Sequence, residues 1–346
     1  MTQQPSSYRA AGVDIDAKYR AVQDARDAIR STYTDGVVGD VGLFGGLFDP
    51  SRAGADGQLL VASTDGVGTK VKVAQAAGML RGVGHDLVNH CVGDILVQGA
   101  RPLFFLDYIA VDRMVPEAVT EVILGLAEAC RANGCALLGG ETAEMPGVYR
   151  PGEMDIAGTI VGCVARERLL DGTRIGAGDV AIALPSSGLH TNGYSLARKA
   201  LFEDAGLQLD ARPEVLGGAS IAEALLVPHR TYLPAVWPLL EQGLVHGMAH
   251  ITGGGLPDNV PRILPADLSV EIDRAAMPRV PIFDLIVEAG NVAPEEAYRV
   301  FNMGFGMVLF VAEPEAGRVL DDLAARGEAA YRVGRVVPGS RQVLLG

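Results

Sequence analysis

The chain has 346 residues, enough for two domains of ordinary size. Apolar residues make up 49% of it and charged residues 21%, which is typical of folded, soluble proteins and excludes a disordered one. Its formal net charge of −13 argues against a nucleic-acid-binding protein, because such a protein needs a basic face to pair with phosphates.

The cysteines and the hydropathy pattern indicate a cytoplasmic protein. The four cysteines form no CxxC pair and stand in apolar contexts, so we expect buried free thiols at Cys91, Cys130, Cys135 and Cys163. No apolar run is long enough to span a membrane, and the first residues lack the pattern of a secretion signal. We therefore expect neither a membrane nor a nucleic acid among the partners.

In chain order, the first notable segment is Gly36–Asp49, which mixes glycines with apolar residues. Phe44, Leu47 and Phe48 would give such a loop something to bury on closing, so one interpretation is a mobile lid that faces phosphates. The alternative is a connection that packs permanently through its apolar tip. The residues alone leave both interpretations open.

Next, Leu59–Lys70 reads LLVASTDGVGTK and predicts a short buried strand, a tight glycine turn and the start of a helix. A carboxylate, a turn, a hydroxyl and a lysine at this spacing suit Mg²⁺ and phosphate, because unpaired N–H groups at a helix start favour anions. The spacing of a Walker loop is absent. A plain strand–turn–helix connection with incidental charges is the alternative.

The segment His85–Gly99 has the spacing of a helix with a buried apolar face. Asp86, His90, Asp94 and Gln98 recur every fourth residue on its other side. Such a polar stripe is either a solvated face or a face turned towards a ligand.

The following stretch, Pro102–Val111, is apolar on both faces and predicts a buried central strand, in which Asp107 needs a partner. A strand over Cys135–Leu138 then runs into glycines and Glu141, and a further strand is expected over Glu153–Val164. The first half thus offers carboxylates suited to hard cations that bridge to phosphates: Asp65, Asp94 and Glu141, with Asp155 as a further candidate.

The segment Leu170–Asp179 is short, polar and rich in glycine, and it predicts a domain boundary between residues 1–170 and 171–346. Beyond it, the strand–turn–helix pattern returns. A strand over Val180–Leu184 ends in serines and a glycine, and a helix is expected from about Gly193.

In the turn between them, Thr191 and Asn192 fit simple helix capping, whereas His190 is less easily explained that way. A similar unit follows at Val245–Ile251, where a strand leads to Thr252 and three glycines, whose N–H groups could hold a phosphate of a second ligand. Strands and helices alternate to the end of the chain, so the sequence predicts an α/β protein with related units in both halves.

Several long segments, in the same order, resemble the phosphoribosylformylglycinamidine cyclo-ligase family, also called aminoimidazole ribonucleotide (AIR) synthetases, of the AIR synthase-like ATP-binding superfamily. They cover nearly the whole chain: AGVDIDA (Ala11–Ala17), STDGVGTK (Ser63–Lys70), VGDILVQGARPLFFLDYIA (Val92–Ala110), GGETAEMPGVY (Gly139–Tyr149), LPSSGLHTNGYSLAR (Leu184–Arg198), HITGGGLPDNVPR (His250–Arg262) and NMGFGMV (Asn302–Val308).

The resemblance implies a two-domain fold and a homodimer. The sheets of the two N-terminal, ATP-binding domains would pair into a barrel, and the C-terminal mixed-sheet domain would contribute the substrate site. ATP and Mg²⁺ are the implied cofactors, and a small phosphoribosyl molecule is the implied substrate. Transient contact with neighbouring purine-pathway enzymes is a further expectation.

The resemblance also implies site residues. For the nucleotide they are Gly45, Gly46, Asp65, Gly66, Gly68, Thr69, Lys70, Asp94 and Glu141. The metal ligands would be Asp65, Asp94 and Glu141. The substrate would contact Ser187, His190, Asn192, Thr252, Gly253 and Gly254.

The implied reaction is the ATP-dependent cyclisation of formylglycinamidine ribonucleotide to aminoimidazole ribonucleotide, with release of ADP and phosphate. ATP would phosphorylate the formyl amide oxygen, and the amidine-side nitrogen would attack that carbon to close the ring. Mg²⁺, held by Asp94 among others, and Lys70 would neutralise charge on the phosphoryl group. A proton must also move, and His190 is the first candidate for this step, with His250 the second.

Two positions depart from the family pattern, which often has Asn in place of Gly93 and a small residue in place of Asp40. Rival interpretations are other ATP-using members of the superfamily: thiamine-monophosphate kinase, selenophosphate synthetase and a hydrogenase-maturation protein. Selenophosphate synthetase is disfavoured because the first cysteine is Cys91, far from the N-terminus. A nucleotide-binding regulator without catalytic activity is a rival of a different class.

Overall fold

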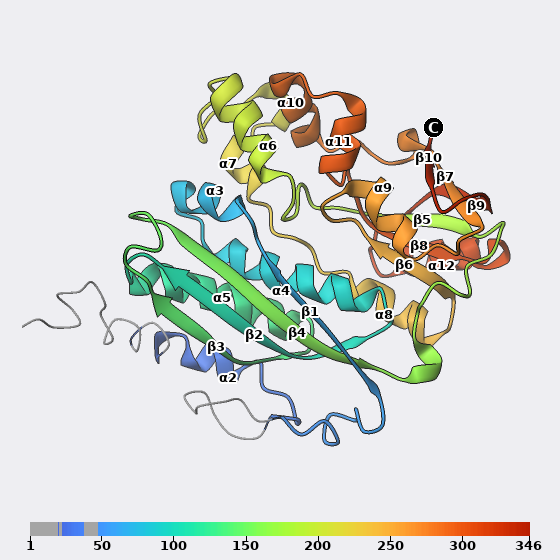
Figure 1. The fold of residues 1–346 in the computed structure, drawn as a ribbon, viewed down its shortest axis with the longest axis horizontal. Coiled ribbons are helices and arrows are strands. Elements are labelled where there is room, and N and C mark those ends of the chain that lie inside the picture. The colour runs from blue at the N-terminus through green and yellow to red at the C-terminus, as the bar shows by residue number, and fades with distance from the viewer. Residues whose placement is uncertain (1–19, 21–22, 38–47) are drawn as a thin grey trace, which may run out of the picture. The chain divides into compact units, whose positions relative to one another are not determined.

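The structure is a computed structural model that describes residue 20, residues 23–37 and residues 48–346. Within this part the chain divides into two compact units (Figure 1). The first comprises the chain up to Cys91 and Pro102–Cys163, and the second comprises Val92–Arg101 and Val164–Gly346. The domain limits expected at residue 170 remain a prediction.

The first unit is built on a four-stranded sheet with the strand order β1–β4–β2–β3, in which β2 and β3 are parallel. Helix α4 and strand β2 each have residues in both units. The elements are α2 (Arg26–Arg30), β1 (Leu59–Gly66), α3 (Lys70–Ala77), α4 (Arg81–Leu96), β2 (Arg101–Val111), α5 (Pro116–Ala132), β3 (Ala136–Glu144) and β4 (Met154–Val164).

Helices α4 and α5 lie on one face of this sheet (Figure 1). They pack closely because Gly84 and Gly125 bring no side chain to their crossing, where a Cβ on either would collide with the backbone of the other helix. On the sheet, Gly158 leaves room for the ring of Phe105 in the same way. The apolar residues of α4 and α5 therefore cover the inner face of the sheet.

The opposite face of the sheet exposes apolar side chains. Leu60 on β1 is 64% exposed, and Leu106 and Tyr108 on β2 are each 37% exposed. The predictions of a buried strand at β1 and of a strand buried on both faces at β2 are therefore wrong for the described chain. Side chains alternate along a strand, and only those that point to α4 and α5 are buried.

Two strands continue through residues that we expected in turns. β1 includes Gly66, and β3 includes Gly140 and Glu141. A Cβ on Gly66 would lie 3.1 Å from the Ile156 carbonyl oxygen, and one on Gly140 would collide with the carboxylate of Asp107. These glycines therefore serve close approach within the sheet rather than a turn.

The second unit contains a six-stranded mixed sheet with the strand order β10–β7–β9–β5–β8–β6. β10 pairs with β7 in parallel, and the other neighbours are antiparallel. Its elements are β5 (Val180–Pro185), α6 (Tyr194–Arg198), α7 (Ile221–Leu225), α8 (Leu233–Glu241), β6 (Val245–His250), α9 (Gly255–Asn259), β7 (Leu268–Ile272), α10 (Pro281–Gly290), α11 (Pro294–Val300), β8 (Phe305–Val311), α12 (Ala316–Ala325), β9 (Tyr331–Pro338) and β10 (Val343–Leu345).

Short helical turns complete this unit. They are η1 (Arg166–Arg168), the π-helix η2 (Lys199–Asp204), η3 (Glu214–Leu216), η4 (Val260–Arg262), η5 (Arg274–Ala276) and η6 (Glu313–Glu315). β8 is buried along its whole length, as expected for a central strand. The predicted two-part α/β fold is confirmed, whereas the barrel between two copies stays a prediction.

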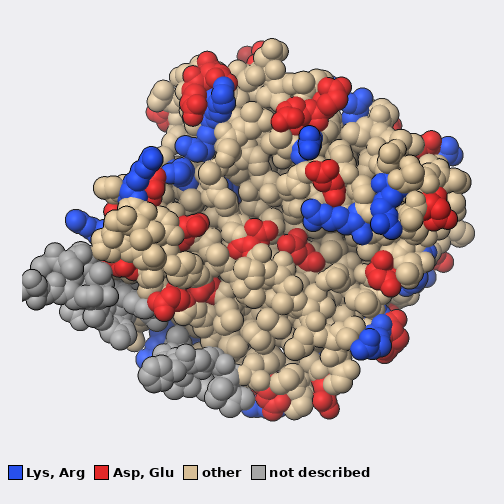
Figure 2. All heavy atoms as spheres, in the orientation of Figure 1, with Lys and Arg blue, Asp and Glu red and all other residues tan. Residues whose placement is uncertain are grey.

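The surface and the thiols agree with the composition. On the face shown in Figure 2, acidic and basic side chains are interspersed rather than gathered by sign. The four cysteines are buried thiols, as expected. Among the described helices, none combines the length and apolar character that a membrane crossing needs.

Candidate active site

In the first unit, Asp65 near the end of β1 points to helix α4. Its Oδ2 lies 2.7 Å from Nε2 of His90, and its Oδ1 accepts a hydrogen bond of 2.7 Å from the Gly66 N–H. His90 is 4% exposed, whereas the side chain of Asp65 is 45% exposed. A buried histidine thus orients a carboxylate that solvent and ligands can still reach.

Lys70 lies at the start of α3, and its ammonium is fully buried against Asp86 of α4, with 2.8 Å between Nζ and Oδ1. Burial lowers the pKa of Lys70, and the neighbouring charge of Asp86 opposes this change. Asp86 and His90 are both buried. The interpretation of their stripe on α4 as a solvated face is therefore wrong, and the contact of Lys70 with phosphate stays a prediction.

The structure does not bring Glu141 to Asp65 within this unit. Strands β1 and β3 lie at opposite edges of the sheet, and Glu141 pairs with Tyr108, whose side chain points to the exposed face. Asp65 points to the other face, towards α4. Asp155 on β4 is exposed as well.

The remaining nucleotide candidates lie around the turn after β1 or outside the described residues. Gly68 has φ +55°, so it makes the left-handed turn, and Thr69 precedes α3 without a side-chain capping bond. Asp40, Gly45 and Gly46 fall outside the described residues. Phe48, at the far end of the glycine-rich segment, packs on Phe104 with 5.0 Å between ring centroids.

In the second unit, His190 sits in the turn after β5 and has φ +60°. A residue with a Cβ pays roughly 1–2 kcal/mol for this left-handed conformation. The ring is 1% exposed, and its Nε2 accepts a hydrogen bond of 3.1 Å from the Ser187 N–H. Non-glycine residues held in this region are enriched at functional sites, which makes His190 a stronger candidate than its sequence position alone.

Asn302 holds this turn in place. Its Nδ2 donates to the Gly188 carbonyl oxygen, and its Oδ1 accepts hydrogen bonds from the Ser186 hydroxyl and the Gly304 N–H. Asn302 is buried. The NMGFG segment therefore acts as a support for the turn that carries His190. The capping interpretation of the neighbouring Thr191 and Asn192 is wrong, because α6 begins after Gly193 without a side-chain cap.

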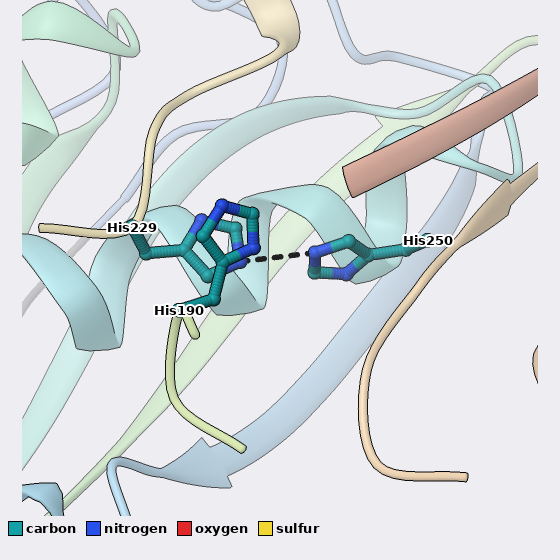
Figure 3. Close-up of side chains that lie close together, drawn as sticks. All are labelled: His190, His229 and His250. Atoms are coloured by element: carbon teal, nitrogen blue, oxygen red, sulfur yellow. Dashed lines mark hydrogen bonds between the residues drawn. The ribbon is translucent and has the colours of Figure 1, made fainter. Parts of the chain in front are cut away.

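His250, at the end of β6, contacts both Asp94 and a further histidine, His229; Figure 3 shows the two histidines. His250 Nδ1 lies 2.9 Å from Oδ1 of Asp94, and His250 Nε2 lies 3.0 Å from Nε2 of His229. His229 Nδ1 in turn lies 2.9 Å from the Arg230 carbonyl oxygen. Both histidines are buried, whereas the side chain of Asp94 is 28% exposed.

The rings of His190 and His229 stack, with 3.7 Å between centroids and 26° between planes. Figure 3 shows the stacked pair facing the ring of His250. Tyr232 meets all three rings edge-on, and burial raises the pKa of its hydroxyl. The structure thus brings the two predicted proton-moving histidines into one cluster.

The sequence analysis missed the segment that carries His229. Residues 227–232 form a loop between α7 and α8, and several hydrogen bonds fasten it to the end of β5. The hydroxyl of Tyr232 and the guanidinium of Arg230 both donate to the Pro185 carbonyl oxygen. The Ser187 hydroxyl donates to the Pro228 carbonyl oxygen. A histidine, an arginine and a tyrosine close together after a proline were the available signal.

The predicted substrate residues after β6 lie beside the turn that carries His190. Asn259, another residue that sequence reasoning missed, donates to the carbonyl oxygens of Thr252, Gly253 and Gly255. Its Oδ1 accepts a hydrogen bond from the Thr252 hydroxyl. A Cβ on Gly253 would lie 3.1 Å from the Asn192 side-chain oxygen, so these two candidates are neighbours, and Gly254 has φ +94°.

The three histidines have ligand atoms within 4.8 Å of one another, as a metal site would require. However, the facing nitrogens of His229 and His250 already contact each other, and the His190 and His229 rings are stacked. A shared ion must lie in the plane of each ring, which stacked rings do not allow. The cluster is therefore a hydrogen-bonded and stacked assembly rather than a ligand set.

The fold and these sites define an AIR synthase-related protein. Residues 42–164 match the family model described as AIR synthase related protein, N-terminal domain, and residues 176–345 match the model for the C-terminal domain. The fold resembles thiamine-monophosphate kinase from Stenotrophomonas maltophilia K279a (TM-score 0.69, 18% identity, 94% of this chain and 95% of that chain). It also resembles a hydrogenase maturation protein HypE in complex with ATP (TM-score 0.64, 20% identity, 95% and 91% covered).

More specifically, the chain belongs to the phosphoribosylformylglycinamidine cyclo-ligase family. It is 48% identical to the cyclo-ligase of Shouchella clausii (strain KSM-K16), over 99% of both chains. It is 46% identical to that of Bifidobacterium animalis subsp. lactis (strain AD011), over 96% of this chain and 97% of the relative. The resemblance seen in the sequence motifs is confirmed.

Proposed function

We propose that the chain catalyses the ATP-dependent cyclisation of formylglycinamidine ribonucleotide to aminoimidazole ribonucleotide in purine biosynthesis. The observation that carries this function is the cluster around His190 and the Asp94–His250 pair, in a chain 48% identical to a named cyclo-ligase. Ring closure requires phosphorylation of the formyl amide oxygen and attack by the amidine-side nitrogen. Both ends of the substrate must be held together while a proton moves.

We assign the proton transfer to His190 rather than His250. Both ring nitrogens of His250 are engaged, one with Asp94 and one with His229. In His190, Nε2 accepts from the Ser187 N–H, so the neutral ring carries its proton on Nδ1. The substrate would lie between this turn, which holds Ser187 and Asn192, and the loop after β6, which holds Thr252, Gly253 and Gly254.

Mg²⁺, which would bridge to the phosphates of ATP, fits two carboxylates of the chain. Carboxylate oxygens are the ligands that Mg²⁺ prefers, and the side chains of Asp65 and Asp94 are both partly exposed. When bound, the ion would neutralise charge on the transferring phosphoryl group. Lys70 would reach the phosphate only by leaving Asp86. Glu141 would join Asp65 only from a second copy of the chain, because within one chain β1 and β3 lie at opposite edges of the sheet.

A homodimer is the second part of the proposal. The exposed face of the first unit's sheet combines Leu60, Leu106 and Tyr108 with the hydrogen-bonded pair Thr64 and Thr159. An equivalent face on a second copy would cover these apolar residues. Sedimentation would then give a dimer, and Leu60→Lys with Leu106→Lys would give a monomer. A wild-type monomer would contradict this arrangement.

We place the enzyme in the cytoplasm, where purine-pathway partners would meet it.

The deciding assay supplies ATP, Mg²⁺ and formylglycinamidine ribonucleotide and follows ADP and aminoimidazole ribonucleotide together. We expect equal amounts of both products. His190→Ala should lower kcat by roughly 10²- to 10⁴-fold, as loss of a proton-transfer residue does. Asp94→Asn should lose activity, whereas His85→Ala should retain it, because His85 contacts Glu128 on the first unit's surface.

Two other outcomes would replace the proposal. If ADP forms only with a different acceptor, such as thiamine monophosphate, the chain is another kind of ATP-using enzyme on this fold. If neither product forms while ATP still binds, a regulatory nucleotide-binding protein takes its place.

A further inference from the structure

We propose that His229 is a positioning residue that fixes the ring of His250 and, through it, the carboxylate of Asp94. The three side chains form a continuous series of contacts: Asp94 to His250, His250 to His229, and His229 to a backbone carbonyl. The part played by Asp94 in catalysis rests on the proposed function. The positioning itself does not.

The series has a direction because it ends on a carbonyl oxygen. The Arg230 carbonyl can only accept, so Nδ1 of His229 must donate to it. In the neutral ring of His229 the other nitrogen, Nε2, then carries no proton. Nε2 of His229 therefore accepts, and Nε2 of His250 donates to it.

This donation determines which nitrogen of His250 faces Asp94. With Nε2 donating to His229, Nδ1 of His250 donates to Oδ1 of Asp94, because a carboxylate can only accept, so both nitrogens of His250 carry protons. One oxygen of Asp94 is thereby held in place. Without the acceptor on His229, the His250 ring can flip or rotate, and Asp94 loses its fixed orientation.

Gly93 supplies independent support. An added Cβ at this position would lie 2.6 Å from Cε1 and 2.8 Å from Nδ1 of His250, so the ring occupies the space that the missing side chain leaves. Gly93 directly precedes Asp94 on α4. The departure from the family pattern at Gly93 therefore lets the His250 ring lie against the helix backbone and reach Asp94.

The loop that carries His229 is rigid enough for this role. Tyr232 and Arg230 both bond the Pro185 carbonyl oxygen, and Arg230 also pairs with Glu328. His229 stacks on His190, the residue to which we assign proton transfer. One loop thus supports both predicted catalytic histidines.

The test uses two substitutions, each of which keeps one of the two hydrogen-bonding groups of His229. His229→Gln retains an acceptor close to the position of Nε2, whereas His229→Asn retains only a donor close to Nδ1. His246→Gln is the matched control, because His246 contacts Asp179 and no member of the series. Thermal unfolding of each variant separates loss of positioning from loss of folding.

The first readout is the ring nitrogens of His250, measured by ¹⁵N NMR on the full chain, whose six histidines can be assigned by single substitutions. We expect a protonated Nε2 in the wild type, the same signal in His229→Gln and His246→Gln, and an altered one in His229→Asn. Gly93→Ala should alter it as well. Unchanged His250 signals in both His229→Asn and Gly93→Ala would overturn the proposal.

The second readout is the cyclisation assay at varied Mg²⁺. We expect His229→Asn to lower kcat by roughly 10- to 100-fold and to raise the Mg²⁺ requirement, with a smaller change in the KM of the substrate. His229→Gln should recover much of this loss, and equal losses in both would contradict positioning. If the wild type forms no product, the proposed function fails while the NMR result still decides the positioning. Stoichiometric zinc bound by the three histidines of the wild type would also overturn it.

Discussion

The two units hold their buried polar groups in different ways. In the first, charged pairs join α4 to its neighbours: Lys70–Asp86, which is buried, and Asp65–His90, of which only His90 is buried. In the second, Asn302, Asn259 and the histidines form hydrogen bonds that fasten turns to one another. The first unit therefore depends on charge balance between α4 and its neighbours, and the second on the shape of a hydrogen-bonded network.

The largest expected effect is the loss of a partner in the buried pair of the first unit. Lys70→Met leaves the carboxylate of Asp86 buried without its counter-charge. Removing one member of a buried ion pair typically costs about 3–5 kcal/mol. We expect the free energy of unfolding, measured with urea, to fall by about this amount.

A neighbouring pair gives the control. Lys72 contacts Glu153 at 2.7 Å, but both side chains are partly exposed, so Lys72→Met should cost less than about 1 kcal/mol. Replacing both partners, in Lys70→Met with Asp86→Leu, should restore much of the stability lost in the single variant. If Lys70→Met is no worse than Lys72→Met, the buried charge is not what this unit depends on.

In the second unit, the corresponding substitution is Gly306→Ala, which changes the packing of a side chain without changing the charge. A Cβ on Gly306 would collide with the hydroxyl of Tyr232, which fastens the 227–232 loop to Pro185. Overpacking of this kind costs about 1–3 kcal/mol, so Gly306→Ala should destabilise the protein by about 2 kcal/mol. It should also lower activity, because the loop carries His229.

A second substitution shows whether the collision is the cause. Tyr232→Phe removes the nearest of the clashing atoms, the hydroxyl oxygen, together with its hydrogen bond to Pro185, and leaves the ring carbon Cζ. In the double variant, Gly306→Ala should therefore cost less than it does alone. Strictly additive losses would show that the alanine acts elsewhere.

The same difference explains how much of the molecule the sequence could predict. The α/β fold followed from the spacing of apolar residues, and the second unit's central strands lay close to where we expected them. The ends of β1 and β3 did not, because glycine indicates either a turn or a close contact. The contacts that decide between them, such as Gly140 with Asp107, join residues far apart in the sequence.

The candidate site divides in a similar way. Residues that stand beside glycine turns, such as Asp65 and His190, were found because their neighbours in the sequence mark them. His229 and Asn259 were missed, because their roles come only from tertiary hydrogen bonds. The burial of Lys70 was missed for the same reason, since its partner Asp86 is on another helix.

The smallest effect we predict concerns a half-buried acid of the first unit, Asp107. Asp107 on β2 is half-buried, and burial, assisted by the charge of Glu141, raises its pKa from 3.8 to about 7. The folded state then binds this proton more tightly than the unfolded chain does. Its stabilising contribution is complete below about pH 4 and is lost as the pH rises through about 7.

This pKa change corresponds to at most about 4 kcal/mol in the free energy of unfolding. Partial exposure of the side chain reduces the expected value to about 1–2 kcal/mol. Asp107→Asn should therefore be more stable than the wild type at pH 8 by this amount and no more stable at pH 4, as measured by urea unfolding. Asp107→Ala should remove the same pH dependence even if it packs less well. If both variants keep the slope of the wild type between pH 4 and 8, ionisation of Asp107 does not limit the stability of the first unit.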